Sequence, residues 1–379
     1  MTDLNATSTP GYTFSTKASS ETYGTSSLYP YHKTEVAQEL IKIANALVNP
    51  RGKGIYATDE SPEGIEARLT AAAGEDNQRK TFSDQEKREQ RRRWRECLYE
   101  TLPTDYISGV ILYSETLIDF KLAPVLEKRG IIPGMRADTD SHPLPISPNE
   151  PATQGLDDLL PRLQAARAAG ARFTKWRAPI LCSASSFPTH AALEAQAESL
   201  ARFAAISQQA GLVPIVEPDV DFGADADLRR SVEVHVKIIS MIYARKTTSI
   251  EEIALATATA LARSVPLAVA GIVFLSGTLI AFSSTGHFAH DLICAGGLSD
   301  SDAALYLHKI NQIVNSAKPP SAFARLPPLT FSFGRGLQGD AMQKWVRGDE
   351  KGAKEVFEER AKVCWGAAQG QLQLVSSSV

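Results

Sequence analysis

The sequence predicts an α/β fold in which a parallel sheet, covered by helices, is built as a (β/α)8 barrel. Short β-rich runs alternate with helical patterns along most of the 379 residues. Such alternation is typical of a parallel sheet with helices packed on it. Several of the runs also end in polar or small residues. In a barrel the carboxyl ends of the strands meet on one face, where active sites are built.

Seven β-rich runs mark the strands, at 54–61, 106–115, 131–138, 172–180, 211–220, 270–277 and 329–336. Helical patterns lie between most of them, as at 156–171, 191–211 and 249–265, and one precedes them at 35–48. The pattern at 249–265 opens with a capping box, Ser249 and Glu252. The strand count approaches that of a TIM (β/α)8 barrel but stays one short of it.

Composition and pattern predict three parts along the chain. Residues 1–30 are rich in Ser, Thr and Gly and read as a flexible arm, 31–370 form the barrel, and 371–379 are a tail.

A net charge of −3 argues against nucleic-acid binding. The run at 87–96 is basic, but we interpret it as a solvated helix face. No apolar stretch predicts a membrane span or signal peptide, and the cysteines lack metal spacing, which favours a reduced, cytoplasmic protein.

Charged residues at the strand ends predict one catalytic cavity. They are Asp59, Lys175, Arg177, Glu217 and Asp219. Carboxylates beside a lysine hold opposite charges together, and this supplies general acids and bases. Any one of them alone could be an ordinary surface residue, but their common register at strand ends favours a site.

The last two strands end where barrels commonly bind phosphate. Ser276 and Gly277 end one, and Gly334 and Arg335 end the other, so loop amides and one cation could hold the anion. The sequence therefore predicts a phosphorylated substrate. No metal-ligand spacing occurs, and neither a metal nor another cofactor is expected; carbon–carbon chemistry would then need an iminium formed by a lysine.

Several motifs together resemble class I fructose-bisphosphate aldolase, in the family's order and over about residues 35–370. They are GIYATDES, ISGVILYSETL, TQGLDDL, ARFTKWR, GLVPIVEPD, GIVFLSG and FSFGRGLQ. The resemblance implies reversible aldol cleavage of fructose 1,6-bisphosphate to glycerone phosphate and glyceraldehyde 3-phosphate, in glycolysis and gluconeogenesis. The family is commonly tetrameric, so a homotetramer is the implied assembly.

The resemblance also implies residue roles. Asp59 matches the aspartate that handles the C4 hydroxyl proton, Lys175 the lysine that helps expel the carbinolamine hydroxyl, and Glu217 the glutamate that shuttles protons to the carbinolamine. The residues matched to phosphate binding are Ser276, Gly277 and Arg335 for the 1-phosphate and Arg68 for the other phosphate.

The sequence departs from the family at strand six. The family's iminium lysine lies there, in a motif of the type LLKPxMV, and this chain has no such motif. Lys237 and Lys246 lie in the region, but helical spacing places them on or after a helix. We therefore find no Schiff-base lysine, and the predicted barrel lacks its sixth strand.

A second departure is an apolar insertion at 278–296, after strand seven. Excising its codons, from within Gly277 to within Gly296, restores the family's LSGG. Our hypothesis is a retained intron here and a skipped exon at strand six. Smaller departures are Arg136 in place of a lysine, Asp219 in place of a glutamate, Ala67 in place of a lysine, and a missing C-terminal tyrosine.

Three functions stay open at this point. The first is the family's aldolase reaction, which describes the intact gene. The second is a non-catalytic sugar-phosphate binder or scaffold, which describes the chain as written. The third is a different phosphosugar barrel that uses Lys175 itself as nucleophile.

Overall fold

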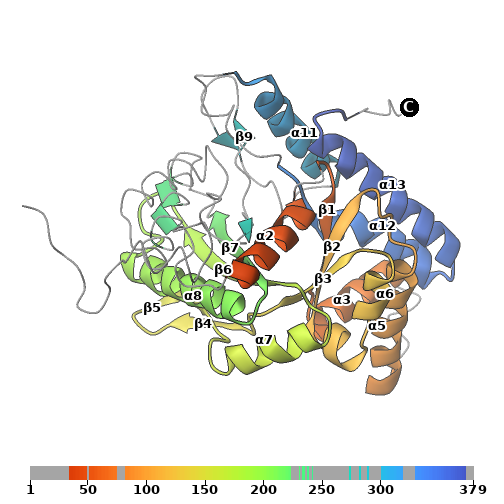
Figure 1. The fold of residues 1–379 in the computed structure, drawn as a ribbon, viewed down its shortest axis with the longest axis horizontal. Coiled ribbons are helices and arrows are strands. Elements are labelled where there is room, and N and C mark those ends of the chain that lie inside the picture. Colours follow the sequence, from red (N-terminus) through yellow and green to blue (C-terminus); the bar gives the residue numbers. More distant parts are fainter. Residues whose placement is uncertain are drawn as a thin grey trace, which may run out of the picture.

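The computed structural model describes residues 34–48, 51–74, 82–222, 230, 233–234, 237–238, 241, 273–274, 281–282, 288–289, 300–318 and 329–372. Within these residues the chain is organised around one parallel sheet with helices packed against it (Figure 1).

The sheet has seven strands in the order β11-β1-β2-β3-β6-β7-β8, and every neighbouring pair is parallel. In chain order they are β1 (Gly54–Thr58), β2 (Ile107–Leu112), β3 (Ile132–Arg136), β6 (Phe173–Cys182), β7 (Val213–Phe222), β8 (Val273–Phe274) and β11 (Ser332–Phe333). Each overlaps a run that the sequence predicts as a strand, so the periodic signal located the sheet correctly.

Helices follow most of the strands. They are α2 (Thr34–Val48), α3 (Pro62–Ala73), α5 (Asp84–Tyr99), α6 (Ala123–Glu127), α7 (Leu159–Ala168), α8 (His190–Gln209), α11 (Asp300–Ser316), α12 (Arg335–Val346) and α13 (Glu350–Ala368), with one π-helical turn at Glu115–Asp119. Ser61 caps α3 by accepting a hydrogen bond from the Gly64 amide, and Pro62 fits the first helical position. The chain therefore turns from strand to helix directly after Asp59 and Glu60.

One face of the sheet forms the interior of the barrel. Side chains of alternate residues meet there, because a strand points successive side chains to opposite faces. This interior cluster is Ile55, Ala57, Ile111, Phe173, Val213 and Ile215, with Leu40 and Leu47 of α2. Helix α2 lies across the strands at this end (Figure 1), so it covers the amino-terminal mouth of the barrel.

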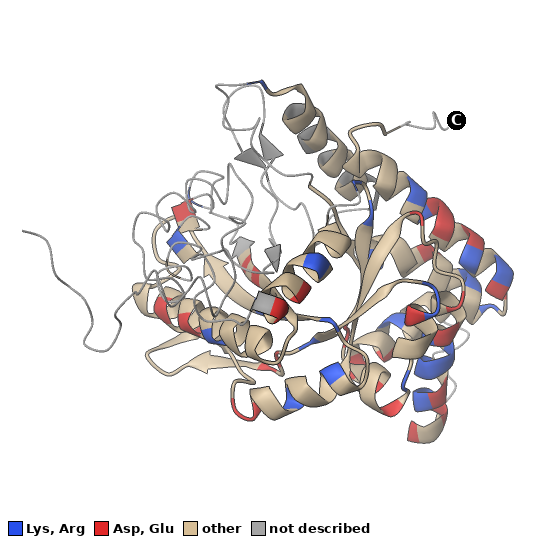
Figure 2. Ribbon diagram, in the orientation of Figure 1, with Lys and Arg blue, Asp and Glu red and all other residues tan. Residues whose placement is uncertain are grey.

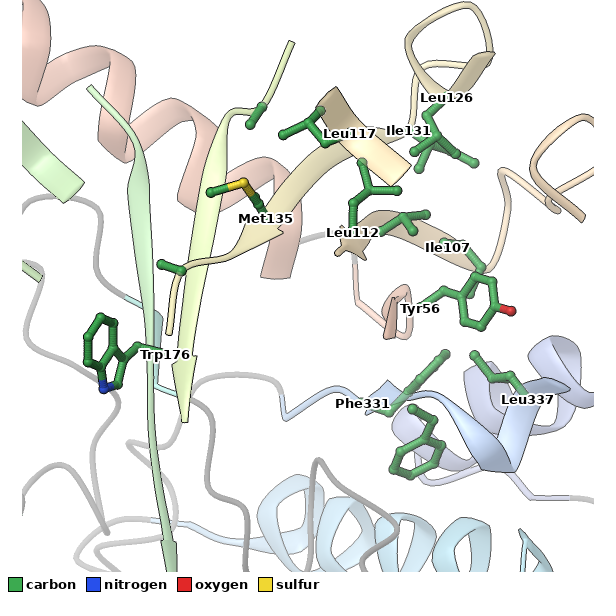
Figure 3. Packing of buried hydrophobic residues seen from close by; sticks show 14 of the residues in the cluster. Tyr56, Ile107, Leu112, Leu117, Leu126, Ile131, Met135, Trp176, Phe331 and Leu337 are labelled. Atoms are coloured by element: carbon green, nitrogen blue, oxygen red, sulfur yellow. The ribbon is translucent and has the colours of Figure 1, made fainter. Parts of the chain in front are cut away.

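The other face of the sheet packs against the helices. Figure 3 shows part of this cluster, in which Tyr56, Leu112, Met135 and Trp176 lie with residues of the helices and loops around them. Both faces of β6 are mostly buried, which explains why its sequence, FTKWRAPILC, does not alternate strictly between apolar and polar residues.

The barrel is incomplete. β7 pairs directly with β8, with Ile215 opposite Val273 and Val216 opposite Phe274. Among the described residues no strand lies between β7 and β8 along the chain, and β8 and β11 are the two edges of the sheet. The fold is thus a TIM (β/α)8 barrel that lacks a strand between its fifth and seventh, as the sequence predicts.

Two short hairpins form sheets of their own. The insertion at 278–296 contributes β9 (Ala281–Phe282) and β10 (Phe288–Ala289), which pair antiparallel. A second hairpin, β4 (Ser141–Leu144) with β5 (Ser147–Thr153), was not expected. Its sequence, SHPLPISPNEPAT, is rich in proline and almost free of β-branched residues, so the usual strand signal is absent.

Three predictions fall wholly or mainly outside the described residues. They are the arm at 1–30, the capped helix at 249–265, and the tail at 371–379, of which only residues 371 and 372 are described. The division into arm, barrel and tail stays a prediction.

Candidate active site

Lys175 occupies the centre of the charged cluster. Residues 173, 175 and 177 of β6 point into the barrel. Along this face the side chains are apolar at the amino end of the strand, with Phe173, and charged toward its carboxyl end, with Lys175 and Arg177. The Lys175 ammonium lies 3.0 Å from Asp59 Oδ2 and 3.1 Å from Glu217 Oε2. Three strands, β1, β6 and β7, therefore bring one cation and two carboxylates together, as the sequence predicts.

Burial makes these contacts strong. Lys175 is 6% exposed and Glu217 is 1% exposed. A charge removed from water is stable only when it is paired. Burial by itself raises the pKa of the Asp59 carboxyl, but the Lys175 ammonium outweighs burial, and with a smaller contribution from Arg136 it holds this pKa below its usual value. Asp59 is therefore ionised at neutral pH and can accept a proton from a hydroxyl group.

A second ion pair lies one step further out on the same strands. The Arg177 guanidinium donates from Nε to Asp219 Oδ2 at 2.6 Å, and its terminal nitrogen lies 2.5 Å from the same oxygen. The Arg177 side chain is 54% exposed, so this pair is open to solvent and to a ligand. The two predicted residues are brought together, beside the buried cluster on the same two strands.

Asp138 and Arg136 belong to the same edge, although neither was predicted as a site residue. Asp138 is buried, accepts from Arg136 Nε at 2.7 Å, and accepts from the Arg177 amide at 3.1 Å. Arg136 also reaches the main-chain oxygen of Asp59, at 3.5 Å. Their position at the end of the β3 run was a signal for both, because the ends of the runs at 54–61, 172–180 and 211–220 also bring charged residues to this edge.

Of the residues predicted to bind phosphate at the last two strands, the structure describes two. Gly334 and Arg335 join β11 to α12, and Arg335 is exposed at the first position of that helix. A side chain at Gly334 would bring its Cβ within 2.7 Å of the Ala57 carbonyl oxygen, so only glycine lets β11 lie this close to β1. Ser276 and Gly277 lie outside the described residues.

Arg68 is on α3, beside the first strand end. Its Nε lies 3.7 Å from Glu60 Oε1, and its side chain is 40% exposed. It therefore lies near Asp59 along the chain but is directed onto the neighbouring Glu60 carboxylate. Lys237 is exposed in a helical stretch, as the sequence predicts, and Lys246 lies outside the described residues.

Two further observations bear on the kind of site. Within the part of the chain that the structure describes, no group of three His, Cys, Asp or Glu side chains could hold a metal ion. In the same residues, none of the helices combines the length and the apolar character that crossing a membrane requires.

The fold and the cluster define a barrel protein of the (β/α)8 class with a charged site at the carboxyl ends of its strands. The chain matches the family described as "Fructose-bisphosphate aldolase class-I" in three segments, 39–248, 244–290 and 291–378. The first junction falls where the sequence lacks strand six, and the second falls inside the insertion at 278–296.

Similar proteins agree with this match. The "Fructose-bisphosphate aldolase, non-muscle type" of Lethenteron camtschaticum is 34% identical over 385 residues, which cover 93% of this chain and 95% of the relative. "Fructose-bisphosphate aldolase 1" of Caenorhabditis elegans is 37% identical, covering 86% and 88%. A structure of fructose-bisphosphate aldolase from Plasmodium falciparum, in complex with TRAP and a small-molecule inhibitor, superposes with a TM-score of 0.69 at 30% identity, covering 89% of this chain and 96% of that one. The chain belongs to the class I fructose-bisphosphate aldolase family.

Proposed function

We propose that this chain binds a phosphorylated ketose at the carboxyl end of its sheet but does not complete the aldol cleavage. The family reaction is the reversible cleavage of fructose 1,6-bisphosphate to glycerone phosphate and glyceraldehyde 3-phosphate. The observation that carries the proposal is the ion pairing of Lys175, whose ammonium lies between the Asp59 and Glu217 carboxylates. Among the described residues no other lysine lies at the carboxyl end of a strand.

Lys175 is poorly suited to form an iminium. Nucleophilic attack on a carbonyl needs a neutral amine, which enzymes obtain by desolvating a lysine or placing it beside another cation. Here the opposite holds, because the neighbouring Asp59 and Glu217 stabilise the charged form. This argues against the reading in which Lys175 is the nucleophile and favours its role as a cation that orients carboxylates.

The remaining residues still suit a phosphosugar. Asp59 is ionised, half-buried and paired with Lys175, so it can accept a hydroxyl proton of the ligand. Arg177 and Arg335 are exposed on the same face and can attract phosphate groups. The chain would therefore act as a sugar-phosphate binder. We expect it to act in the cytoplasm and to form the homotetramer that is common in the family.

Two measurements on the purified chain test the proposal. Titration calorimetry with fructose 1,6-bisphosphate should give saturable binding, and an assay coupled to triose phosphate should give no cleavage at ordinary enzyme rates. Cleavage would contradict the claim of inactivity and favour an enzyme that uses a lysine we have not placed. Absence of binding would contradict the ligand class and favour a scaffold role. The control is a chain with a strand-six segment restored after Ala244 and Thr278–Gly296 removed, which should bind and cleave.

A further inference from the structure

A buried polar cluster joins the first strand of the barrel to the last helix pair. We call it the Glu60 cluster; its members are Tyr56 and Glu60 of the β1 region, Arg95 of α5 and Gln338 of α12. Gln338 Nε2 donates to Glu60 Oε1 at 2.5 Å, and the Tyr56 hydroxyl donates to Gln338 Oε1 at 2.5 Å. Arg95 donates to Glu60 Oε2 at 2.8 Å and lies 3.4 Å from Gln338 Oε1.

Arg95 keeps its charge in this cluster, and Tyr56 stays neutral. Arg95 is 3% exposed, and although burial disfavours its charge, Glu60 overcomes that effect and raises the Arg95 pKa above its ordinary value. Burial raises the pKa of Tyr56 well above its usual range, so its hydroxyl stays a neutral donor. Arg95 and Tyr56 therefore both remain hydrogen-bond donors in this cluster.

Gln338 occupies a special place along the chain. Glu60 directly follows Asp59, and Gln338 lies three residues after Arg335, so it is one turn further along α12. The carboxyl–amide bond between Glu60 and Gln338 thus connects the catalytic end of β1 to the turn that carries the phosphate-binding arginine.

The incomplete barrel makes this connection more important. β11 lies at an edge of the sheet and pairs with β1 through only two positions, Ile55 with Ser332 and Tyr56 with Phe333. Apolar contacts place α12 and α13 as a unit, as with Phe357, whose ring lies 4.8 Å from that of Tyr56. Such contacts are not directional. The orientation of the first turn of α12 needs hydrogen bonds of fixed geometry.

We propose that Gln338 is a positioning residue, which holds Arg335 in place relative to Asp59 through its bond to Glu60. The proposal rests on the proposed binding of a phosphorylated sugar. Gln338 does not touch the ligand; its contribution is to orient a group that does.

The test compares two buried glutamines of equal exposure. Gln338→Met keeps the length of the side chain but removes its hydrogen bonds. Gln196→Met is the matched control, because Gln196 is also 1% exposed and donates to the carbonyl oxygens of Pro151 in β5 and Pro179 in β6, which belong neither to β1 nor to α12. Both variants should lose stability. Gln338→Met alone should weaken the binding of fructose 1,6-bisphosphate, by roughly tenfold, the effect of one lost contact to a charged group.

A second measurement does not depend on a ligand. The amides of residues 337 and 338 donate to the Gly334 carbonyl in the first turn of α12. Their hydrogen exchange should become faster in Gln338→Met, relative to global unfolding, and stay unchanged in Gln196→Met. If the unaltered chain binds no sugar phosphate, the proposed function fails, and the exchange rates still test Gln338. Equal exchange in the two variants, or equal loss of affinity, would overturn the positioning role.

Discussion

Replacing Lys175 by methionine should produce a large and pH-dependent loss of stability. The change keeps an unbranched side chain of similar length but leaves the Asp59 and Glu217 carboxylates without the ammonium that lies 3.0 and 3.1 Å from them. Breaking a buried ion pair by removing one partner costs about 3–5 kcal/mol. We expect a loss of that size in the free energy of unfolding at pH 7, measured by urea denaturation.

The pH dependence follows from the direction of the Asp59 pKa. Burial raises this pKa, but Lys175 outweighs burial, so the folded value lies below the usual one. The ion pair therefore stabilises the fold fully above the pKa of an unfolded aspartate, about 3.9, and loses its effect as the pH falls through the lower folded value. In Lys175→Met the folded pKa should rise, so the difference from the unaltered chain should shrink below about pH 4.

Arg177→Met provides the control for this experiment. It lies two residues further on the same face of β6, pairs with Asp219, and is 54% exposed. An exposed pair contributes about 0–1 kcal/mol. If Lys175→Met loses no more stability than Arg177→Met at pH 7, or if its loss does not depend on pH, the buried cluster is not the structural centre that we describe.

Three other changes have definite expected outcomes. Gly334→Ala should destabilise the chain by about 1–3 kcal/mol, because its Cβ would lie 2.7 Å from the Ala57 carbonyl oxygen; an unaltered urea midpoint would be inconsistent with this close approach. Arg335→Ala in the repaired chain should weaken binding of a bisphosphate inhibitor by about 1.5–3 kcal/mol, and an unchanged affinity would place the phosphate elsewhere. The unrepaired chain should aggregate more than the repaired one, because β8 and β11 end the sheet that the described residues form; a monodisperse chain with a sharp thermal transition would count against a splicing error.

The positions of the strands and of the buried cluster could be predicted from the sequence. Polar residues at the ends of apolar runs meet on one face of a parallel sheet, so the sequence alone predicts that Asp59, Lys175 and Glu217 lie together, as they do in the structure. The missing strand was also visible, because the chain between the β-rich runs at 211–220 and 270–277 contains only helical patterns.

Other features carried no readable signal. Gln338 looks like an ordinary polar residue of a helix, and its contact with Glu60 joins positions 278 residues apart. Nor could the sequence decide whether β7 would pair with β8 or leave its edge open, because pairing between strands far apart in the chain leaves no local signal in either strand. The structure has β7 paired with β8, and within the described residues β8 and β11 are the ends of the sheet.

Borohydride reduction in the presence of fructose 1,6-bisphosphate, followed by intact-mass measurement, tests the central claim most directly. A Schiff base between a lysine and the sugar would be reduced to a stable adduct. The account predicts an unchanged mass for this chain and a single adduct for the chain repaired at strand six. An adduct on the unrepaired chain would contradict it, and mapping that adduct to Lys175 would show that the paired lysine is the nucleophile after all.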